Sequence, residues 1–257
     1  EILIIIIVII VLVVYFFSKS SSNDQTVSTT YSAEYYRGLN YLLNNEDDKA
    51  LKIFTDLIDV DSSTIETHLA LGGVYRRRGE FDKAILIHQN LLSRPNLDKS
   101  IKNQSLYELS KDFFSAGLYD KSEKILLNLK SNKSYYESCN EYLLLTYELS
   151  KDWDKAITFS KDLKNEIIRN TSREVLIAQY YCEKAIDYLK DEQLNKTITV
   201  LKKAVDVNKS CTRAYKLLFE LNVDSNPELA FDYLHSLIKI NSNFILIVSK
   251  DILRLSS

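Results

Sequence analysis

The chain has 257 residues, enough for one or two domains, and its 33 lysines and arginines nearly balance 35 aspartates and glutamates, which leaves a net charge of −2. This balance argues against a generally basic nucleic-acid-binding protein and against an acidic disordered tail. Five glycines and two prolines are too few for the turns of hairpin-rich β folds, and 46% apolar residues are too many for a low-complexity chain. The composition therefore predicts an all-α fold with short polar connections.

The first seventeen residues predict a transmembrane anchor. Residues 2–17 are apolar without one charge, and as a helix they would extend about 24 Å against a hydrocarbon core of about 30 Å. Residues ahead of Glu1 and the aromatic end at 15–17 could supply the missing length. The positive-inside rule, applied to Lys19 and Glu1, places the following chain in the cytoplasm. Two alternatives stay open: a buried β-strand, and a signal peptide cleaved near residues 18–20.

Residues 18–30 form a polar segment dominated by Ser and Thr. It has no helical period, so we expect a flexible tether between the anchor and residues 31–257.

Residues 31–257 contain an internal repeat, which is the strongest signal in the chain. Gly38, Tyr41, Ala50 and Phe54 recur 34 positions later as Gly72, Tyr75, Ala84 and His88. Later copies are less regular, which predicts insertions near 93–103 and 164–176. The expected repeats, about six in number, lie near 31–64, 65–98, 103–136, 137–170, 178–210 and 211–243.

The spacing of small and large residues resembles that of the tetratricopeptide repeat, a hairpin of two helices. The helices would cross at the small residues, where a larger side chain would overpack by roughly 1–3 kcal/mol. Stacked hairpins bury one continuous core and curl into a superhelix, or α-solenoid, whose concave face is lined by the first helix of each hairpin. The sequence therefore predicts an all-α fold: a transmembrane helix followed by an α-solenoid.

Counting from the repeat starts gives candidate residues for the concave face. Aromatic and charged side chains on such a face suit an extended peptide or a partner helix, although any one of them could simply be packed or solvated. The predicted partner-binding residues are Tyr35, Leu39, Arg76, Arg77, Tyr107, Lys111, Phe114, Glu141, Gln179 and Ile186, with Gly73, Cys182, Tyr215 and Phe219 as further candidates.

Three consecutive arginines, Arg76 to Arg78, precede Gly79 at a predicted helix end. Cations are favourable at a helix C-terminus, so a solvated cap is one interpretation. The alternative is a docking point for acidic groups of a partner.

No motif indicates catalysis, a cofactor or a metal. His68, His88 and His235 are far apart and lack metal-ligand spacing, so ordinary helix residues are expected. The three cysteines form no Cys-x-x-Cys pair and fit a reducing compartment. Cys182 is expected to be a small buried apolar residue. The chain has neither a glycine-rich phosphate loop nor a nucleophile elbow.

The exact sequences of several segments point to a narrower family than the repeat spacing does. Residues 33–44 read AEYYRGLNYLLN, 48–54 DKALKIF, 66–72 ETHLALG and 75–85 YRRRGEFDKAI. With 116–123 and 181–183, these segments resemble the lipopolysaccharide assembly protein B family of Gram-negative bacteria over roughly residues 1–215.

The resemblance implies a single-pass inner-membrane adaptor whose soluble part faces the cytoplasm. It implies protein partners: an AAA+ membrane protease, the deacetylase that commits to lipid A synthesis, and a membrane regulator that senses lipopolysaccharide. The adaptor would bring the deacetylase to the protease for degradation. No nucleic acid is expected, and a homo-oligomer stays open. Members end in a rubredoxin-like module with two Cys-x-x-Cys pairs, which is absent up to Ser257, so no metal is carried over to this chain.

A second hypothesis is a non-enzymatic periplasmic scaffold that organises envelope proteins after signal cleavage. The N-terminus discriminates the two, because an intact apolar stretch in membranes supports the adaptor.

Overall fold

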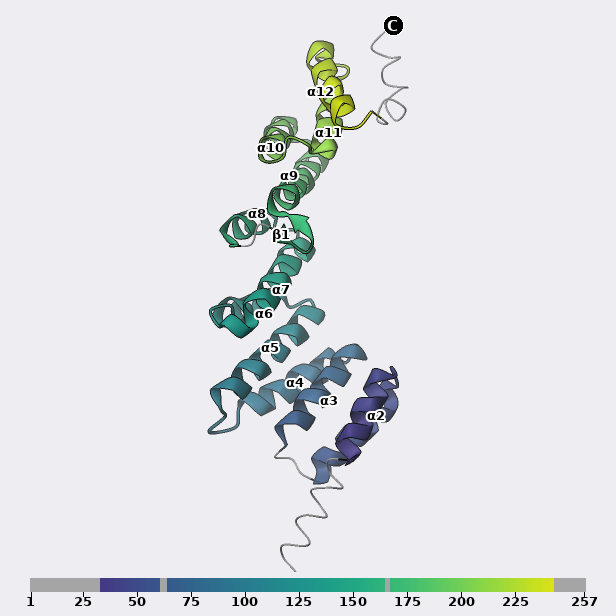
Figure 1. The fold of residues 1–257 in the computed structure, drawn as a ribbon, viewed down its shortest axis with the longest axis vertical. Helices are drawn as coiled ribbons and strands as arrows, with labels where there is room; N and C mark the ends of the chain where they lie inside the picture. Colours follow the sequence, from purple (N-terminus) through teal and green to yellow (C-terminus); the bar gives the residue numbers. More distant parts are fainter. Residues whose placement is uncertain (1–32, 61–63, 165–166, 243–257) are drawn as a thin grey trace, which may run out of the picture. The chain divides into compact units, whose positions relative to one another are not determined.

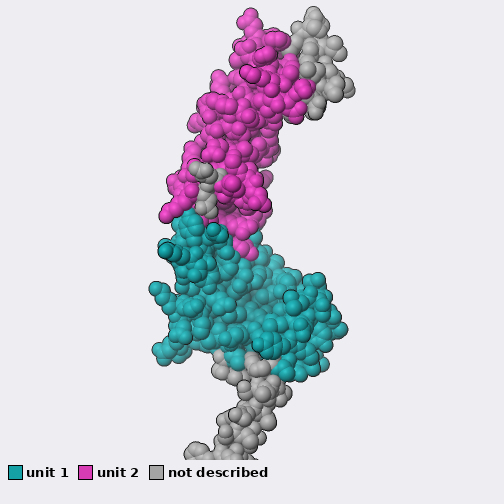
Figure 2. All heavy atoms as spheres, in the orientation of Figure 1, with its two compact units in different colours: residues 1–139 teal, residues 140–257 magenta. Residues whose placement is uncertain are grey.

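The computed structural model describes residues 33–60, 64–164 and 167–242, and the predicted anchor and tether lie outside them. Within these ranges, no helix combines the length and apolar content needed to cross a bilayer. The regular structure of the described ranges is helical apart from one short β-hairpin, so the all-α prediction is confirmed there with that exception (Figure 1). Two compact units, residues 1–139 and 140–257, are coloured separately in Figure 2.

Unit 1 is a stack of antiparallel helical hairpins. A helix over residues 33–43 precedes α2, α3 pairs with α4, and α5 pairs with α6, while α4 also packs on α5. The first helices α3 and α5 contact each other directly. The elements are α2 (Asp47–Val60), α3 (Ile65–Arg77), α4 (Phe81–Leu92), α5 (Lys99–Ser115), α6 (Tyr119–Leu129), the 3-10 turn η1 (Lys133–Tyr135) and α7 (Tyr136–Leu149), within which the unit ends.

Unit 2 repeats the hairpin plan with one insertion. Helix α9 packs on α8 and α10, and α11 pairs with α12 and also contacts α9 and α10. The insertion predicted near 164–176 contains an antiparallel hairpin in which Ile167 faces Ser172 and Ile168 faces Thr171. The elements after α7 are α8 (Trp153–Asp162), β1 (Ile167–Ile168), β2 (Thr171–Ser172), α9 (Arg173–Lys190), α10 (Leu194–Val207), α11 (Thr212–Asn222) and α12 (Pro227–Ile240).

Several of the turns inside the hairpins contain a residue in the left-handed region. Gly79 and Gly117 have φ of 77° and 73°, where glycine avoids the steric cost of a side chain. Two of the second helices are capped at their N-termini, because the side chain of Asp152 accepts from the backbone N–H of Lys155 and the side chain of Asn226 accepts from the backbone N–H of Leu229.

The small repeat residues lie where a hairpin needs close approach. A Cβ added at Gly38 would stand 2.8 Å from the Phe54 ring, and one at Gly72 would stand 2.4 Å from Cε1 of His88. Ala50 and Ala84, one turn before these large residues, are fully buried. The reason given for the repeat pattern therefore holds in the first two hairpins.

We expect Gly72→Ala to lower the free energy of unfolding by about 1–3 kcal/mol, because either the His88 ring or the helix must move. Gly73→Ala is the matched control, since its new Cβ would find no atom closer than Nη2 of Arg76 at 3.8 Å. The control should be neutral or slightly stabilising, because alanine favours helix over glycine. Urea unfolding followed by circular dichroism measures both variants, and equal unfolding midpoints would contradict this packing.

Candidate partner-binding face

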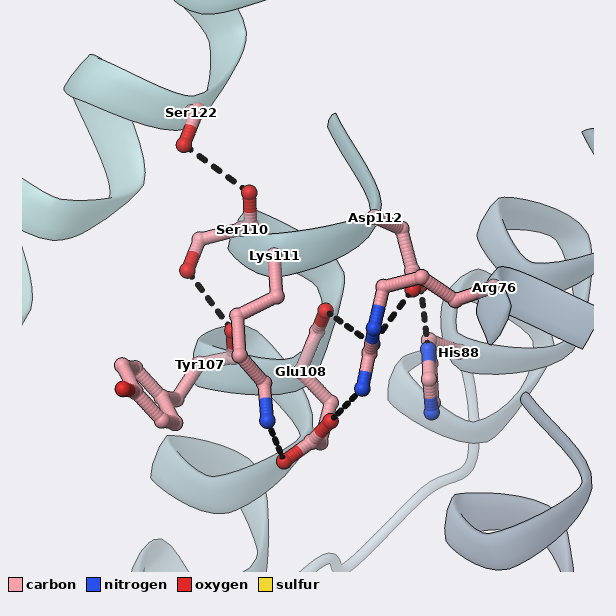
Figure 3. A network of polar contacts seen from close by, with 8 residues as sticks. All are labelled: Arg76, His88, Tyr107, Glu108, Ser110, Lys111, Asp112 and Ser122. Carbon is pink, nitrogen blue, oxygen red and sulfur yellow. Dashed lines mark hydrogen bonds and ion pairs between the residues drawn. The ribbon is translucent and has the colours of Figure 1, made fainter. Parts of the chain in front are cut away.

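Arg76 joins the first helices of two neighbouring hairpins in unit 1. From the last turn of α3, its Nη1 donates to Oδ1 of Asp112 at 2.6 Å and its Nη2 to Oε2 of Glu108 at 2.8 Å, both on α5 (Figure 3). Burial lowers the pKa of the Arg76 guanidinium, but the charges of Glu108 and Asp112 outweigh burial and hold the pKa above its usual value. The side chain is only 17% exposed, so the pair fixes α3 against α5.

His88 completes this cluster from α4. Its Nδ1 meets Oδ2 of Asp112, and both side chains are fully buried. The imidazole occupies the repeat position that Phe54 fills in the preceding hairpin, directly over Gly72. Among the described residues its Nε2 has no hydrogen-bond partner. The buried carboxylate of Asp112 thus contacts Arg76 of α3 and His88 of α4. Removing one member of such a cluster is expected to destabilise the fold.

A polar and aromatic strip follows on α5. Nζ of Lys111 lies 2.6 Å from Oε1 of Glu108 and 5.0 Å from the centre of the Tyr107 ring. The Tyr107 ring packs against Tyr135 with centres 5.3 Å apart. Burial raises the pKa of Glu108, but Lys111 and Arg76 outweigh it and hold that pKa below its usual range. We call Arg76, Tyr107, Glu108 and Lys111 the α3–α5 face.

Two buried serines fix α5 from the α6 side. The hydroxyl of Ser122 donates to the backbone carbonyl oxygen of Ser110 at 2.8 Å. The hydroxyl of Ser110 donates to the backbone carbonyl oxygen of Tyr107 at 2.6 Å. Figure 3 shows this chain of bonds leading away from the ion-pair cluster. The backbone that carries Tyr107 and Lys111 is therefore held on two sides, as a preorganised binding surface requires.

The arginine run divides into one half-buried residue, Arg76, and two exposed residues, Arg77 and Arg78. The interpretation of Arg76 as a solvated cap is wrong, because its charge is matched by carboxylates 32 and 36 residues away. Arg77 does remain at the surface, where its Nη2 meets Oδ1 of Asp47 on α2 at 3.0 Å. Exposed pairs of this kind contribute little to stability. Arg78 meets Asp48 and Glu80 in the same way.

The other predicted residues of unit 1 contribute to packing. Tyr35 and Leu39 are half-buried against the core around α2 and α3, and the Tyr35 ring lies 5.8 Å from that of Phe54. Phe114 is half-buried beside Tyr119 of α6. These three side chains therefore pack within the hairpins of unit 1.

In unit 2 the predicted residues lie on α7 and α9. Glu141 is exposed, and Gln179 and Ile186 are half-buried. Gln179 accepts from Nη1 of Arg213 at 3.3 Å, and the same nitrogen donates to Glu183 at 2.7 Å. This is a second polar link between first helices, here α9 and α11.

Two of the further candidates are not on any surface. Cys182 and Phe219 are fully buried in the cores of unit 2, so placing them on the concave face is wrong. The repeat spacing assigned both residues to the concave face, but their side chains pack into the cores between the helices of unit 2. Tyr215 is half-buried, with its ring 6.4 Å from that of Tyr233 on α12, and Gly73 is half-buried on α3.

Comparison with known proteins agrees with the repeat and with the family resemblance. A model of the tetratricopeptide repeat matches residues 67–100. Lipopolysaccharide assembly protein B of Escherichia coli is 33% identical over 74% of this chain, and that of Haemophilus influenzae is 31% identical over 85%. The chain belongs to the lipopolysaccharide assembly protein B family. It covers 48% and 57% of these two relatives and so spans about half their length.

A solved structure shows the same fold. The C-terminal part of a tetratricopeptide-repeat protein from Cytophaga hutchinsonii is similar with a TM-score of 0.50 and 12% identity, over 86% of this chain and 84% of that one. For this member of the lipopolysaccharide assembly protein B family, the tetratricopeptide fold indicates protein partners.

Sequence reasoning missed one polar cluster in this family member. Arg169, at the tip of the β1–β2 hairpin, donates from Nη1 to Oε2 of Glu148 at 3.0 Å and also contacts Tyr180, whose hydroxyl donates to the same carboxylate. Burial raises the pKa of Glu148, but the bonds from Arg169 and Tyr180 outweigh it and lower that pKa. The hairpin is thereby tied to α7 and α9. Strands of two residues have no readable period, so only the predicted insertion pointed to this region.

Proposed function

We propose that this chain is a membrane-anchored adaptor that limits lipopolysaccharide synthesis by bringing the lipid A-committing deacetylase to an AAA+ membrane protease for degradation. The observation that carries the proposal is its 31–33% identity to lipopolysaccharide assembly protein B over 74–85% of its length. A tetratricopeptide fold, which serves protein recognition, supports it. The adaptor itself makes and breaks no bonds.

The α3–α5 face is the proposed docking site for a partner. Tyr107 and Lys111 offer an aromatic edge and a cation, and Glu108 offers an acceptor, on a backbone held by buried polar contacts. Aromatic anchors with few rotatable bonds lose little entropy on binding. An extended peptide or a helix with an acidic and an apolar side chain at neighbouring positions matches this chemistry.

In this proposal the apolar segment 2–17 and the polar segment 18–30 tether the repeats to the membrane. A partner held on the repeats of an anchored chain stays close to a membrane protease. Short flexible linkers give effective concentrations on the order of millimolar. The repeats would therefore select the deacetylase, and the anchor would select the protease and the regulator.

We expect deletion of residues 1–17 to lengthen the deacetylase half-life at least twofold in cells that rely on this chain, because the client is no longer delivered at the membrane. A chase after translation arrest, followed by immunoblotting of the deacetylase, measures it. Replacement of residues 2–17 by an unrelated membrane-spanning segment is the matched control and tests whether tethering alone suffices. An unchanged half-life after deletion would contradict the adaptor, and a mature chain that begins near Ser20 would favour the periplasmic scaffold.

A further inference from the structure

Two of the three cysteines meet in the core of unit 2. Cys182 lies in the middle of α9, and Cys211 is the N-cap residue directly before α11, yet their Sγ atoms are 3.8 Å apart. Their exposed fractions are 0% and 2%. The sulfur atoms are therefore in contact across two first helices, although 29 residues separate them in the sequence. No function described above uses them.

The surroundings favour a charge on Cys211. The contact with the Cys182 thiol lowers the pKa of Cys211 to about 6 against the effect of burial, and the backbone N–H groups of Ala214 and Arg213 in the first turn of α11 act in the same direction. The bond to Cys211 and burial together raise the pKa of Cys182. Within the pair, the pKa of Cys211 is thus held below its usual value and the pKa of Cys182 above its own.

Cys139 shows how burial alone, without a second thiol, changes the pKa of a cysteine in this chain. It is fully buried in α7, and burial raises its pKa to about 11. A protonated, enclosed thiol of this kind reacts slowly with oxidants. The chain therefore carries its own internal control for the thiol pair.

The position of Cys211 also gives a route to solvent. Lys209 and Ser210, immediately before it, are exposed. Cys211 itself is the N-cap residue of α11, and helix ends open more readily than helix interiors. A small opening of the 208–212 segment would bring the sulfur to water without unfolding α9.

We propose that Cys182 and Cys211 are a site of reversible oxidation that closes to an intrachain disulfide when hydrogen peroxide or another hydroperoxide is present. The Cys211 thiolate attacks one peroxide oxygen, the O–O bond breaks, and the released hydroxide takes up a proton to become water. Cys182 then gives up its proton and attacks the Cys211 sulfenic acid, and the sulfenic oxygen leaves as a second water. The two thiols lose two electrons and two protons, and the peroxide is reduced to water.

Closure brings two sulfur atoms that are already in contact to bonding distance. The sulfurs must approach from 3.8 Å to about 2.05 Å, and each lies at the end of one rotatable Cα–Cβ bond. The new bond would tie α9 to α11 beside Gln179, whose Nε2 lies 3.9 Å from Sγ of Cys211. In a reducing cytoplasm such a bond is transient and marks an oxidative event.

The test treats the purified full chain with hydrogen peroxide and digests it after alkylation of the remaining thiols. The expected result is a loss of about 2 Da, from two hydrogen atoms, in a peptide pair that links Cys182 to Cys211 and that dithiothreitol separates again. Cys139→Ser should behave as the wild type. Cys211→Ser should form no link, and Cys182→Ser should leave a Cys211 sulfenic acid that dimedone traps.

Circular dichroism of each variant shows whether it is folded. In addition, the link should raise the thermal midpoint of the wild type by several degrees, because it restricts the unfolded chain. Absence of the link at a peroxide concentration that oxidises free cysteine, or a link that involves Cys139, would overturn the proposal.

Discussion

Replacing Asp112 with leucine is expected to lower the free energy of unfolding of the chain by about 3–5 kcal/mol, because removal of one member of a buried ion cluster leaves the others without compensation. The fully buried carboxylate accepts from Arg76 and contacts His88. Arg76 keeps only Glu108, and Nδ1 of His88 loses the carboxylate oxygen that it contacts. Urea unfolding measures the loss, and hydrogen exchange should locate it in α3, α4 and α5.

A compensating substitution separates lost polar contacts from poor packing. His88 takes the place that Phe54 fills in the first hairpin, so His88→Phe removes the buried imidazole and keeps the shape of the repeat. The double variant H88F/D112L should therefore recover about 1–3 kcal/mol relative to D112L, because apolar side chains can replace a buried ionic group without loss. A D112L chain as stable as the wild type, or a double variant with strictly additive losses, would show that the cluster does not hold the hairpins.

The second large effect concerns partner binding. The double substitution of Tyr107 and Lys111 by alanine should weaken binding of the deacetylase about 10- to 100-fold, the range expected when an aromatic anchor and its neighbouring cation are both removed. The fold should survive, because Glu108 still pairs with Arg76. Titration of the purified chain with the deacetylase, by calorimetry or fluorescence anisotropy, gives the ratio.

The matched control for binding is the pair Lys124→Ala and Asn128→Ala on α6, both exposed and on a second helix. This control should bind within about twofold of the wild type, as surface substitutions outside an interface do. If the control and the α3–α5 variant lose affinity equally, the binding surface lies elsewhere.

The repeat register was the part of the fold that the sequence could predict. The 34-residue step aligns Gly38 and Phe54 of the first hairpin with Gly72 and His88 of the second. In both hairpins the structure brings the glycine against the large side chain. Small and large residues at a fixed spacing act within one hairpin, so their packing is a local property that the sequence displays. The same reasoning predicted the position of the insertion before α9, but not its β-hairpin.

The polar contacts between hairpins were beyond sequence reasoning. Arg76 follows the pattern of a helix cap, and nothing local distinguishes it from Arg77, yet Arg76 is half-buried and paired with α5 while Arg77 is exposed. Its partners are 32 and 36 residues away, a separation set by how the hairpins stack. One signal was present: His88 is a polar residue at a repeat position where the first copy has phenylalanine.

The contact between Cys182 and Cys211 could likewise not be predicted from the sequence. Burial of Cys182 could be predicted from its place on a first helix, and the structure confirms it. Its contact with Cys211 depends on the stacking of α9 and α11, which no spacing rule for cysteines describes.

Site-specific photocrosslinking in membranes tests the central claim most directly, namely that the chain acts by holding a protein partner on the first helices of its repeats. A photoreactive amino acid at position 107, on the α3–α5 face, should yield a covalent adduct with the deacetylase, whereas the same probe at the exposed position 128 on α6 should not. Equal adducts at both positions, or none with the deacetylase at position 107, would contradict the account.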